Sequence, residues 1–494
     1  MQKKQTILVV ASLLVVVLSV TLAYFTAQII GKGKNVTINS ADLKIIFTDS
    51  DGSISGTNIE PGKWNVTKTF TIENKSNETY KYNIVIQDLV NTFVTNGYLQ
   101  YKITSTNGGY NMTEFKDVPK SETATDTILA YSVSIPVGVT QSYTVEFKYA
   151  NDESVDQSID MGKKLSGTLF ITEGTEEPTL LAQLLVDKST VLTRTDFSTV
   201  LTTDNTNTLY TSTEDSKTVY YFAGNATDNW VKFGKNASNQ DLYWRIIRTN
   251  SDGGVRLLYH GTSTTATDAY IGTSAFNSSF NNIAYVSYMY GNLGSVANAR
   301  ENTTNSTIKT IIDNWYVANL NTNYGKYLST TAVYCNDRST SDNKYFGAYT
   351  RLYTNKIPTY DCTTTEDKFT VDTSTGNGKL TYPIALMTAD EVSFAGGLMS
   401  TNAATWYYYN SANGSSTSST LWWLLSPSSW SVGYASVFSV GGSFFPGFLD
   451  KDNGNVSSRG SVRPAISLKS CIKYSTGNGS ASDPYTIKET TSGC

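Results

Sequence analysis

Alternating apolar and polar positions dominate the first part of the chain after its opening residues. Between about residues 35 and 172, runs such as NVTKTFTIEN, YKYNIVIQ, SYTVEFKYA and KLSGTLFITE place apolar side chains at every second position. Turns rich in Gly, Asn and Asp separate these runs. A period of two is that of a strand with one buried face. The pattern predicts roughly eight strands packed as a β-sandwich or jelly roll.

The rest of the chain mixes strands with a few helices. LYWRIIRT and VRLLYHG flank a turn at residues 250–254 and predict a hairpin, because its glycines can adopt positive φ. Residues 180–186 predict a short helix, and Thr388 or Asp390 is a candidate cap for another. The most regular helical pattern is STIKTIIDNWYVANL, whose apolar stripe comprises Ile308, Ile311, Ile312 and Trp315.

The opening residues form a separate apolar block. Two lysines precede an apolar run from Ile7 to Val20, and the small residues Thr21 and Ala23 stand before a candidate cut at Tyr24. This is the layout of a cleavable signal peptide. The alternative is an uncleaved anchor, since the longer apolar stretch from Ile7 to Phe25 just reaches the roughly 18–20 residues that a spanning helix needs. Both interpretations deliver the rest of the chain outside the cell, and only an uncleaved segment would contact the membrane.

These patterns predict five parts. Residues 1–23 are the signal peptide or anchor, 24–173 the sandwich, 174–205 a linker, 206–470 a second domain and 471–494 a polar tail. The predicted fold class is mainly β, with an α+β second domain. The formal net charge is −4 and only 16% of residues are charged. Nucleic-acid binding requires a basic surface, so no nucleic-acid partner is expected.

Four cysteines lie after the predicted signal. None belongs to a C-x-x-C pair, and export favours disulfides with three possible connectivities. Pairing of sequence neighbours is favoured here over the other two, which gives Cys335 with Cys362 and Cys471 with Cys494. The single histidine, His260, ends an apolar run and is interpreted as a half-buried residue at a strand end.

A first resemblance covers about residues 1–172. The signal, LAYFT, the strand ADLKI and an N-x-x-P-G motif precede I-x-N; the motif residues are Asn58, Pro61, Gly62, Ile72 and Asn74. This order resembles the TasA/camelysin family of exported jelly-roll proteins that form biofilm matrix fibres. The resemblance implies self-assembly or contact with other matrix subunits of a Gram-positive-type bacterium. It also gives the apolar segment 24–30 a candidate role in pairing with a neighbour's sheet edge.

A second resemblance covers about residues 206–470. YYFAGNATDNWVKF, YWRIIR, TIKTIIDNWY, TADEVSFAGG, WWLLSP and VRPAISL occur in that order. The set resembles a domain of exported Firmicutes proteins, and its W-W-L-x-S-P…V-R-P-A ending is similar to the C-type-lectin-like fold. That fold implies a ligand-binding surface between residues 427 and 462. Its formylglycine-generating relatives use a reactive cysteine pair, but no matching motif surrounds Cys335 and Cys362.

Aromatic residues interleaved with Ser and Gly are typical of binding loops, because rigid rings supply contact area at low entropic cost. The segment SSWSVGYASVFSVGGSFFPGFLD has this composition. The alternative interpretation is that half of these rings face the core. The candidate ligand-binding residues are Trp430, Tyr434, Phe438, Phe444, Phe445 and Phe448.

No cofactor is expected, and calcium is the metal considered. Residues 450–455 and 49–52 carry alternating oxygen ligands, but the twelfth position counted from Asp450 is Ser461 and not the Glu of a calcium loop. No catalytic residue is assigned. Asp390 and Glu391 could carry acid–base chemistry without histidine. They diverge by about 100° on a helix, however, and are better interpreted as helix-start charges.

The sequence therefore predicts a non-enzymatic extracellular surface or biofilm-matrix protein. Its lectin-like domain would bind a glycan or a protein on a host or bacterial surface. Two alternatives stay open: a purely structural fibre subunit, and a secreted hydrolase that uses paired carboxylates.

Overall fold

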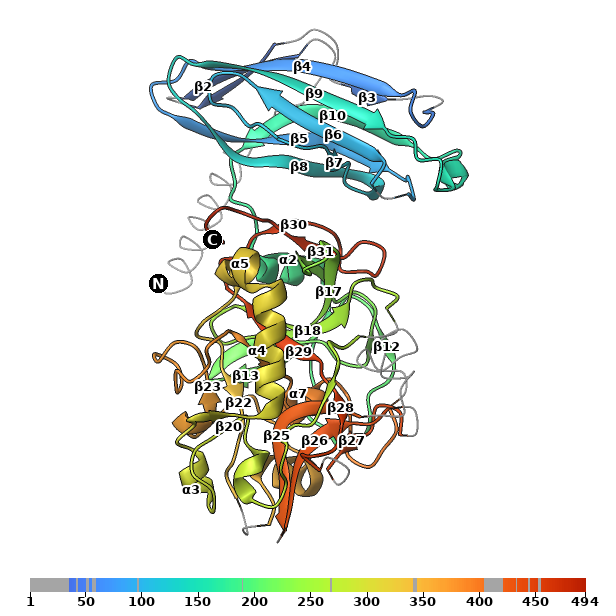
Figure 1. Cartoon of the computed structure of the whole chain (residues 1–494). Coiled ribbons are helices and arrows are strands. Elements are labelled where there is room, and N and C mark those ends of the chain that lie inside the picture. The colour runs from blue at the N-terminus through green and yellow to red at the C-terminus, as the bar shows by residue number, and fades with distance from the viewer. Residues whose placement is uncertain are drawn as a thin grey trace, which may run out of the picture. The chain divides into compact units, whose positions relative to one another are not determined.

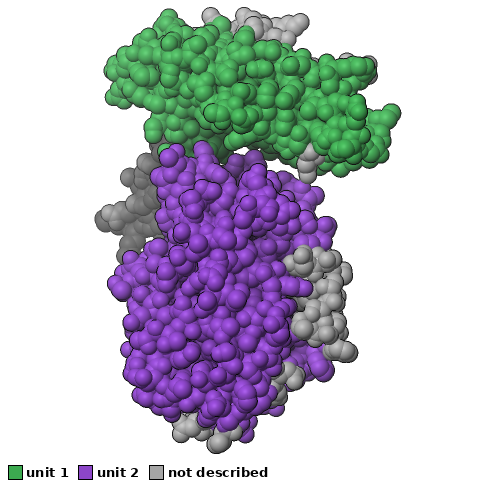
Figure 2. Space-filling view, in the orientation of Figure 1, with its two compact units in different colours: residues 1–177 green, residues 178–494 purple. Residues whose placement is uncertain are grey.

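The computed structural model divides into two compact units, Met1–Glu177 and Pro178–Cys494 (Figures 1 and 2). It describes residues 35–40, 43–49, 53–55, 59–95, 97–188, 190–266, 269–340, 344–403, 421–431, 433–442, 445–451 and 455–494. The predicted signal peptide or anchor therefore lies outside the described residues. None of the helices within these ranges is long and apolar enough to cross a membrane.

The first unit is built from two antiparallel sheets (Figure 1). In spatial order the larger comprises β1 (Asn35–Ser40), β2 (Leu43–Asp49), β4 (Asn65–Asn74), β9 (Thr140–Tyr149), β6 (Leu99–Ser105) and β7 (Lys116–Asp117). The smaller comprises β3 (Ser53–Ser55), β10 (Leu165–Glu173), β5 (Tyr80–Asn91) and β8 (Ser121–Ile135). One short 3-10 helix, η1 (Gln157–Asp160), lies between β9 and β10.

Both sheets bury their apolar faces in one shared core. Ile72 and Val145 enter it from the larger sheet, and Ile84 and Ile171 from the smaller. The Tyr82 hydroxyl of the smaller sheet hydrogen-bonds that of Tyr143 in the larger. Alternate positions along β9 are buried, as expected for a strand with one face in a core. The predicted β-sandwich character of this unit is confirmed.

The second unit contains a larger, mixed sheet. Its main path is β11 (Thr190–Thr193), β13 (Thr208–Glu214), β14 (Lys217–Tyr221), β17 (Asp241–Thr249), β16 (Trp230–Lys235), β31 (Tyr485–Ile487) and β30 (Tyr474–Thr476). It branches from β17 through β18 (Val255–Gly261), β29 (Pro464–Leu468) and β24 (Ile384–Leu386). A second sheet comprises β19 (Thr273–Ser274), β28 (Gly460–Ser461), β25 (Trp422–Ser431), β26 (Tyr434–Val440) and β27 (Leu449–Asp450).

Short elements connect these sheets. The two-stranded pairs are β12 (Asp204–Asn205) with β15 (Asn225–Ala226), β20 (Met289–Tyr290) with β21 (Thr304–Asn305), and β22 (Tyr334–Cys335) with β23 (Lys368–Phe369). The α-helices are α2 (Leu180–Asp187), α3 (Val296–Ala299), α4 (Thr307–Asn319), α5 (Asn321–Tyr324), α6 (Gly347–Tyr349) and α7 (Ala389–Phe394). The 3-10 helices are η2 (Ile283–Val286), η3 (Gly325–Tyr327) and η5 (Thr365–Asp367), and η4 (Thr350–Asn355) is a π-helix.

The predicted hairpin and helices are present. β17 and β18 pair across a turn in which Asn250 N–H donates to Gly254 O at 2.8 Å, and Gly253 has a φ of +83°. Helix α4 begins after Ser306, whose side chain accepts from Lys309 N–H. Its buried stripe differs in part from the prediction, because Ile311 is 38% exposed and Tyr316 is buried instead.

Two predicted boundaries are wrong. Residues 178–205, assigned to a linker, belong to the second unit: Leu180 and Leu184 of α2 are buried in its core, and β11 pairs with β13. The predicted polar tail, residues 471–494, contributes β30 and β31 to the large sheet. A few buried side chains and backbone hydrogen bonds place both segments in the second unit.

The predicted disulfide pairing is confirmed. Cys335 bonds Cys362, with a Cα–Cα distance of 5.8 Å, and Cys471 bonds Cys494, at 5.7 Å. The first bond ties β22 to the loop before η5, and the second fixes the C-terminal residue. Two disulfide bonds are compatible with an exported protein.

We expect that replacing Cys335 and Cys362 by Ala lowers the free energy of unfolding by about 3–4 kcal/mol. The bond closes a loop of roughly 28 residues, and its loss restores that entropy to the unfolded chain. Chemical denaturation of the purified double variant measures the change. The Cys471–Cys494 bond closes a loop of similar length. The Cys471→Ala/Cys494→Ala variant should therefore lose a similar free energy of unfolding. An unchanged denaturation midpoint in both variants would contradict the structural role.

Candidate functional site

Two arginines lie opposite each other inside the large sheet. Arg248 of β17 pairs in register with Arg256 of β18, and both residues are 2% exposed. Apolar residues flank both arginines in the runs WRIIRT and VRLL, the first of which also contains the buried Arg245. Like charges directly across a sheet repel each other, and a buried charge requires a partner. Their burial therefore demands a counter-charge.

Glu391 of α7 supplies that counter-charge. Its Oε1 accepts from Arg248 Nε at 2.9 Å and from Arg256 Nη1 at 2.7 Å. Its Oε2 accepts from Thr388 N–H at 2.9 Å, while Thr388 Oγ1 accepts from Glu391 N–H at 3.1 Å. This reciprocal arrangement is the capping box that starts α7. One carboxylate thus begins the helix and neutralises the arginine pair.

The remaining guanidinium donors also have partners. Arg248 Nη2 donates to Glu214 Oε1 at 2.7 Å, and Arg256 Nη2 donates to Val333 O at 2.5 Å. The two guanidinium groups lie 4.4 and 4.5 Å from the ring centres of Tyr360 and Tyr334, respectively. We call Glu214, Arg248, Arg256 and Glu391 the charged core.

A third arginine joins η4 to α7. Arg351 binds Asp390 with both Nε, at 3.1 Å, and Nη2, at 2.9 Å, and its Nη1 donates to Asp337 at 2.6 Å. The same Asp390 carboxylate accepts from Thr359 N–H at 3.1 Å. Asp390 and Glu391 thus point to different arginines, as their helical separation predicts.

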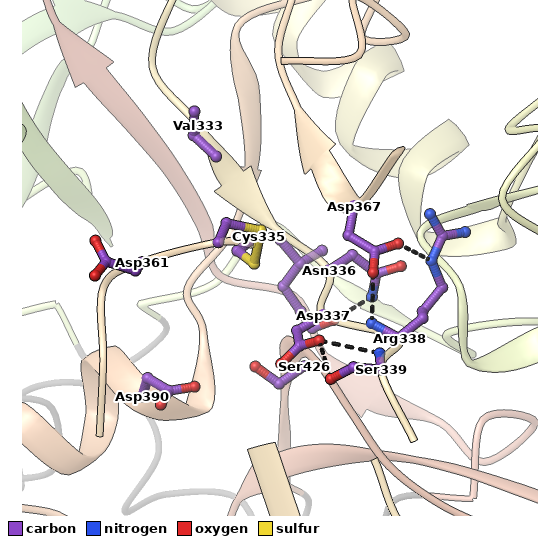
Figure 3. The surroundings of a disulfide bond; sticks show 12 residues. Val333, Cys335, Asn336, Asp337, Arg338, Ser339, Asp361, Asp367, Asp390 and Ser426 are labelled. Atoms are coloured by element: carbon purple, nitrogen blue, oxygen red, sulfur yellow. Dashed lines mark hydrogen bonds and ion pairs between the residues drawn. A yellow bond between two sulfur atoms is a disulfide. The ribbon is translucent and has the colours of Figure 1, made fainter. Parts of the chain in front are cut away.

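A fourth arginine lies next to the Cys335–Cys362 disulfide (Figure 3). Arg338 Nε donates to Asp367 Oδ1 at 2.7 Å, and Arg300 Nη2 donates to Asp367 Oδ2 at 2.8 Å. The side chains of Arg338 and Asp367 are almost completely buried.

The pKa values of the acidic residues reflect these contacts. Burial alone raises the pKa of Glu391, but Arg256 and Arg248 outweigh it, so that the pKa lies below its ordinary value. The same balance between burial and Arg248 lowers the pKa of Glu214. Arg351 likewise outweighs burial at Asp337, whose pKa is lowered. The three carboxylates therefore stay ionised at neutral pH.

The cavity among these side chains is small. It is lined by Arg248, Arg351, Asp390, Glu391 and Ser426, among others, and its free volume is about 20 Å³. Such a volume holds roughly one water molecule. The disulfide at Cys335 closes one side of the same region (Figure 3). A substrate-sized ligand does not fit this space, so the site is suited to fixing strands and helices in place.

The predicted aromatic residues occupy different environments. Phe438 is fully buried in β26, so its assignment to the ligand-binding surface is wrong. Tyr434 is 40% exposed and lies edge-on to Phe280, with ring centres 6.4 Å apart. Trp430 is half-buried on β25. Trp430 lies opposite Ala435 and Tyr434 opposite Ser431. Trp430 and Tyr434 therefore lie on opposite faces of the hairpin.

The loop after β26 carries the other candidates. Phe445 is 51% exposed, and its ring centre lies 5.5 Å from that of half-buried Phe448. Phe444 lies outside the described residues. Phe445 and Phe448 therefore form one exposed aromatic pair, while the six predicted residues do not form a single surface.

His260 is completely buried and not half-buried as predicted. Its ring lies edge-on to Trp230 with centres 4.3 Å apart. β18 is buried along its whole length, because the neighbouring strands β17 and β29 continue the sheet on both sides. The position at the end of an apolar run did not reveal this burial.

No group of three or more His, Cys, Asp or Glu residues that could hold a metal occurs in the part of the chain that the structure describes. Residues 50–52 and 452–454 of the two considered calcium loops lie outside that part. Asp450 is buried at the end of β27.

The first unit carries a larger open hollow. It has a volume of about 620 Å³ and lies between the Pro61 turn and the segment that connects β9 to β10. Two exposed apolar residues, Val155 and Met161, line it. At its base the Asp160 carboxylate accepts hydrogen bonds from Thr95 and from the Tyr149 hydroxyl. The alternation pattern did not reveal this hollow, because the connecting segment has no strand period.

Sequence reasoning also missed the charged core. The only available signal was Arg248 and Arg256 within apolar runs, which predicts buried charges but does not name their partner. Glu214 and Glu391 lie 34 and 143 residues from Arg248 along the chain. Only the fold brings them together.

No protein-family model, curated protein or solved structure matches this chain. The resemblances to the TasA/camelysin family and to the C-type-lectin-like fold therefore stay predictions.

We expect that Glu391→Gln lowers the free energy of unfolding at neutral pH by about 3–5 kcal/mol, because two buried guanidinium groups lose their counter-charge. The pKa of Glu391 is lowered by folding, so its contribution is complete above its ordinary value of 4.5 and is lost as the pH falls below it. The difference between the variant and the wild type should shrink in acid.

Denaturation curves at several pH values measure both effects. Glu60→Gln is the matched control, because Glu60 forms an ion pair with Lys63 on the exposed surface and its loss should leave stability unchanged. A Glu391→Gln variant as stable as the control at neutral pH would contradict a central role for the charged core.

Proposed function

We propose that this chain is an extracellular surface or biofilm-matrix protein whose second unit binds a glycan or a protein ligand. The observation that carries the proposal is the Phe445–Phe448 pair. Phe445 is 51% exposed and lies against half-buried Phe448 in the loop after β26, whereas Phe438 of that strand is buried. Exposed aromatic groups with small polar neighbours are typical of recognition loops. On this proposal the first unit is a TasA/camelysin-like jelly roll and the second a C-type-lectin-like domain.

Binding is favoured over hydrolysis by the state of the carboxylates. A general acid must carry a proton near neutral pH, which requires a raised pKa. Glu391 has a lowered pKa instead, and the Asp390 carboxylate accepts hydrogen bonds from Nε and Nη2 of Arg351. Little space remains around them for a substrate.

We expect that Phe445→Ser weakens ligand binding by at least roughly tenfold and leaves the unfolding temperature unchanged, since an exposed ring contributes contact area but little core packing. A glycan array identifies a bound glycan for the wild type, and titration with that glycan compares the variant. If the array shows no binding, the same titration uses whichever host or bacterial surface protein binds the wild type.

Phe438→Ala is the matched comparison from the same segment. Removing this buried ring should destabilise the second unit by about 3–5 kcal/mol. Should Phe445→Ser unfold the protein as Phe438→Ala does, or bind as the wild type does, this binding surface would be wrong.

A structural fibre subunit is the second candidate function, favoured by the long edge strand of the first unit. β8 is 15 residues long and, within the described ranges, pairs with β5 alone. An unpaired strand edge is a template for another chain. An exposed apolar surface is added by Val155, Ile159 and Met161, which lie in the segment that connects β9 to β10.

We expect that deleting residues 24–34 prevents assembly of the purified protein, because the apolar segment YFTAQII would supply the pairing strand. Electron microscopy of the deletion variant and the wild type tests this. Fibres of normal length from the deletion variant would reject this mode of assembly. The variant must retain the wild-type unfolding temperature for the comparison to be valid.

A further inference from the structure

A row of three tyrosines runs along α6 and η4: Tyr345 lies just before α6, Tyr349 ends it and Tyr353 lies in η4. Tyr345, Tyr349 and Tyr353 recur at intervals of four residues. The rings of Tyr345 and Tyr349 are stacked with centres 3.9 Å apart, and those of Tyr349 and Tyr353 are 5.2 Å apart. Tyr353 is 45% exposed, whereas Tyr349 is largely buried beneath its neighbours. The row therefore presents ring surface to solvent from a fixed base.

Lysines from two segments converge on this row: Lys344 and Lys356 flank α6 and η4, and Lys451 follows β27. Lys344 Nζ lies 4.9 Å from the ring centre of Tyr345, and Lys356 Nζ lies 5.4 Å from that of Tyr353. Lys451 Nζ lies 5.5 Å from Tyr349 and 5.6 Å from Tyr353. We call these three lysines and three tyrosines the tyrosine–lysine stripe.

The stripe brings three ammonium groups close to its rings. Arg351 lies within the same helical segment, but its charge is matched by Asp337 and Asp390. The pKa of Tyr345 is lowered, first by its hydrogen bond with Lys344 and then by that with Tyr349, with further contributions from the charges of Lys344 and Lys451. An ordinary exposed tyrosine has no such shift. The ammonium groups of Lys344 and Lys451 that favour this phenolate can also attract an anionic ligand.

The stripe is fixed to the predicted aromatic segment. Trp430 N–H donates to Lys344 O at 2.7 Å, and Tyr345 forms a bridge with Ser429. Ser428 Oγ donates to Lys451 O at 2.7 Å. Hydrogen bonds to β25 therefore position the backbone at Lys344, Tyr345 and Lys451.

We propose that the tyrosine–lysine stripe binds an acidic polysaccharide whose sugar rings carry carboxylates. This inference rests on the proposed ligand-binding function of the second unit. Aromatic rings pack against the apolar C–H face of a sugar ring, and ammonium groups attract the carboxylates. An acidic peptide would draw affinity from backbone hydrogen bonds, but the backbone of a helical segment bonds mainly within itself. Recognition here must come from rings and charges, which a uronic acid polymer offers at every residue.

The experiment uses the full chain with three polymers of matched length: polygalacturonate, neutral galactan and polyglutamate. Calorimetric titration at low salt should give a dissociation constant for polygalacturonate at least roughly tenfold below the other two. Its binding should weaken as the ionic strength rises. Equal binding of neutral galactan, or of polyglutamate, would overturn the proposal.

Lys344→Gln/Lys451→Gln and Tyr353→Ala should each weaken polygalacturonate binding by at least tenfold. Lys148→Gln is the control, because Lys148 Nζ lies 3.8 Å from the Phe115 ring centre in the first unit and has the same chemistry away from the stripe. Stripe variants that fold and bind as this control does would overturn the assignment. If Tyr353→Ala unfolds the protein, the Lys344→Gln/Lys451→Gln variant still tests the proposal.

The two proposals fail separately. Retained binding of another glycan or a protein through Phe445, without affinity for polygalacturonate, would reject the stripe and leave the proposed function intact. Binding of polygalacturonate that depends on the lysines but not on Phe445 would support the stripe and reject the Phe445 surface.

Discussion

The arrangement of the second unit depends on the neutralisation of two buried arginines by one carboxylate. Arg248 and Arg256 face each other in adjacent strands, and Glu391 accepts from both. Glu214 adds the end of β13 to the same group. Buried ion pairs often contribute little net stability, because desolvation offsets attraction, yet removing one partner is costly. The charged core therefore adds little net stability. Its main effect is to exclude other arrangements of β13, β17, β18 and α7, in which a buried charge would lack its partner.

This constraint extends to the surface through Arg351. Its guanidinium group binds Asp390, the residue next to Glu391, while the flanking residues Tyr349 and Tyr353 contribute to the row of rings. Helix α7 is also attached to β25, because Ser426 Oγ accepts from Ala389 N–H at 3.0 Å. The exposed aromatic and lysine side chains thus extend from elements whose positions the interior already fixes. Such preorganisation lowers the entropic cost of binding.

Much of the fold follows from local pattern, and its failures share a physical cause. Alternation predicts the sandwich, and the disulfide pairs follow from sequence neighbours. The composition of the aromatic segment misleads for Phe438, because residues 435–440 are buried on both faces of β26. Composition also fails for residues 471–494, where Tyr485 and Ile487 of β31 are buried within the sheet. The charged core could not be predicted, since Glu214 and Glu391 lie 34 and 143 residues from Arg248 along the chain.

The second unit carries two groups of side chains that a fixed interior supports. The charged core is hydrogen-bonded throughout, and the cavity beside it has a free volume of about 20 Å³. Recognition needs only exposed groups on a rigid base. Two such groups meet where Trp430 N–H bonds Lys344 O. One is the aromatic segment, which composition predicts. The other is the tyrosine–lysine stripe, whose members only the fold brings together. Their junction joins apolar contact to positive charge, the combination that an acidic glycan requires.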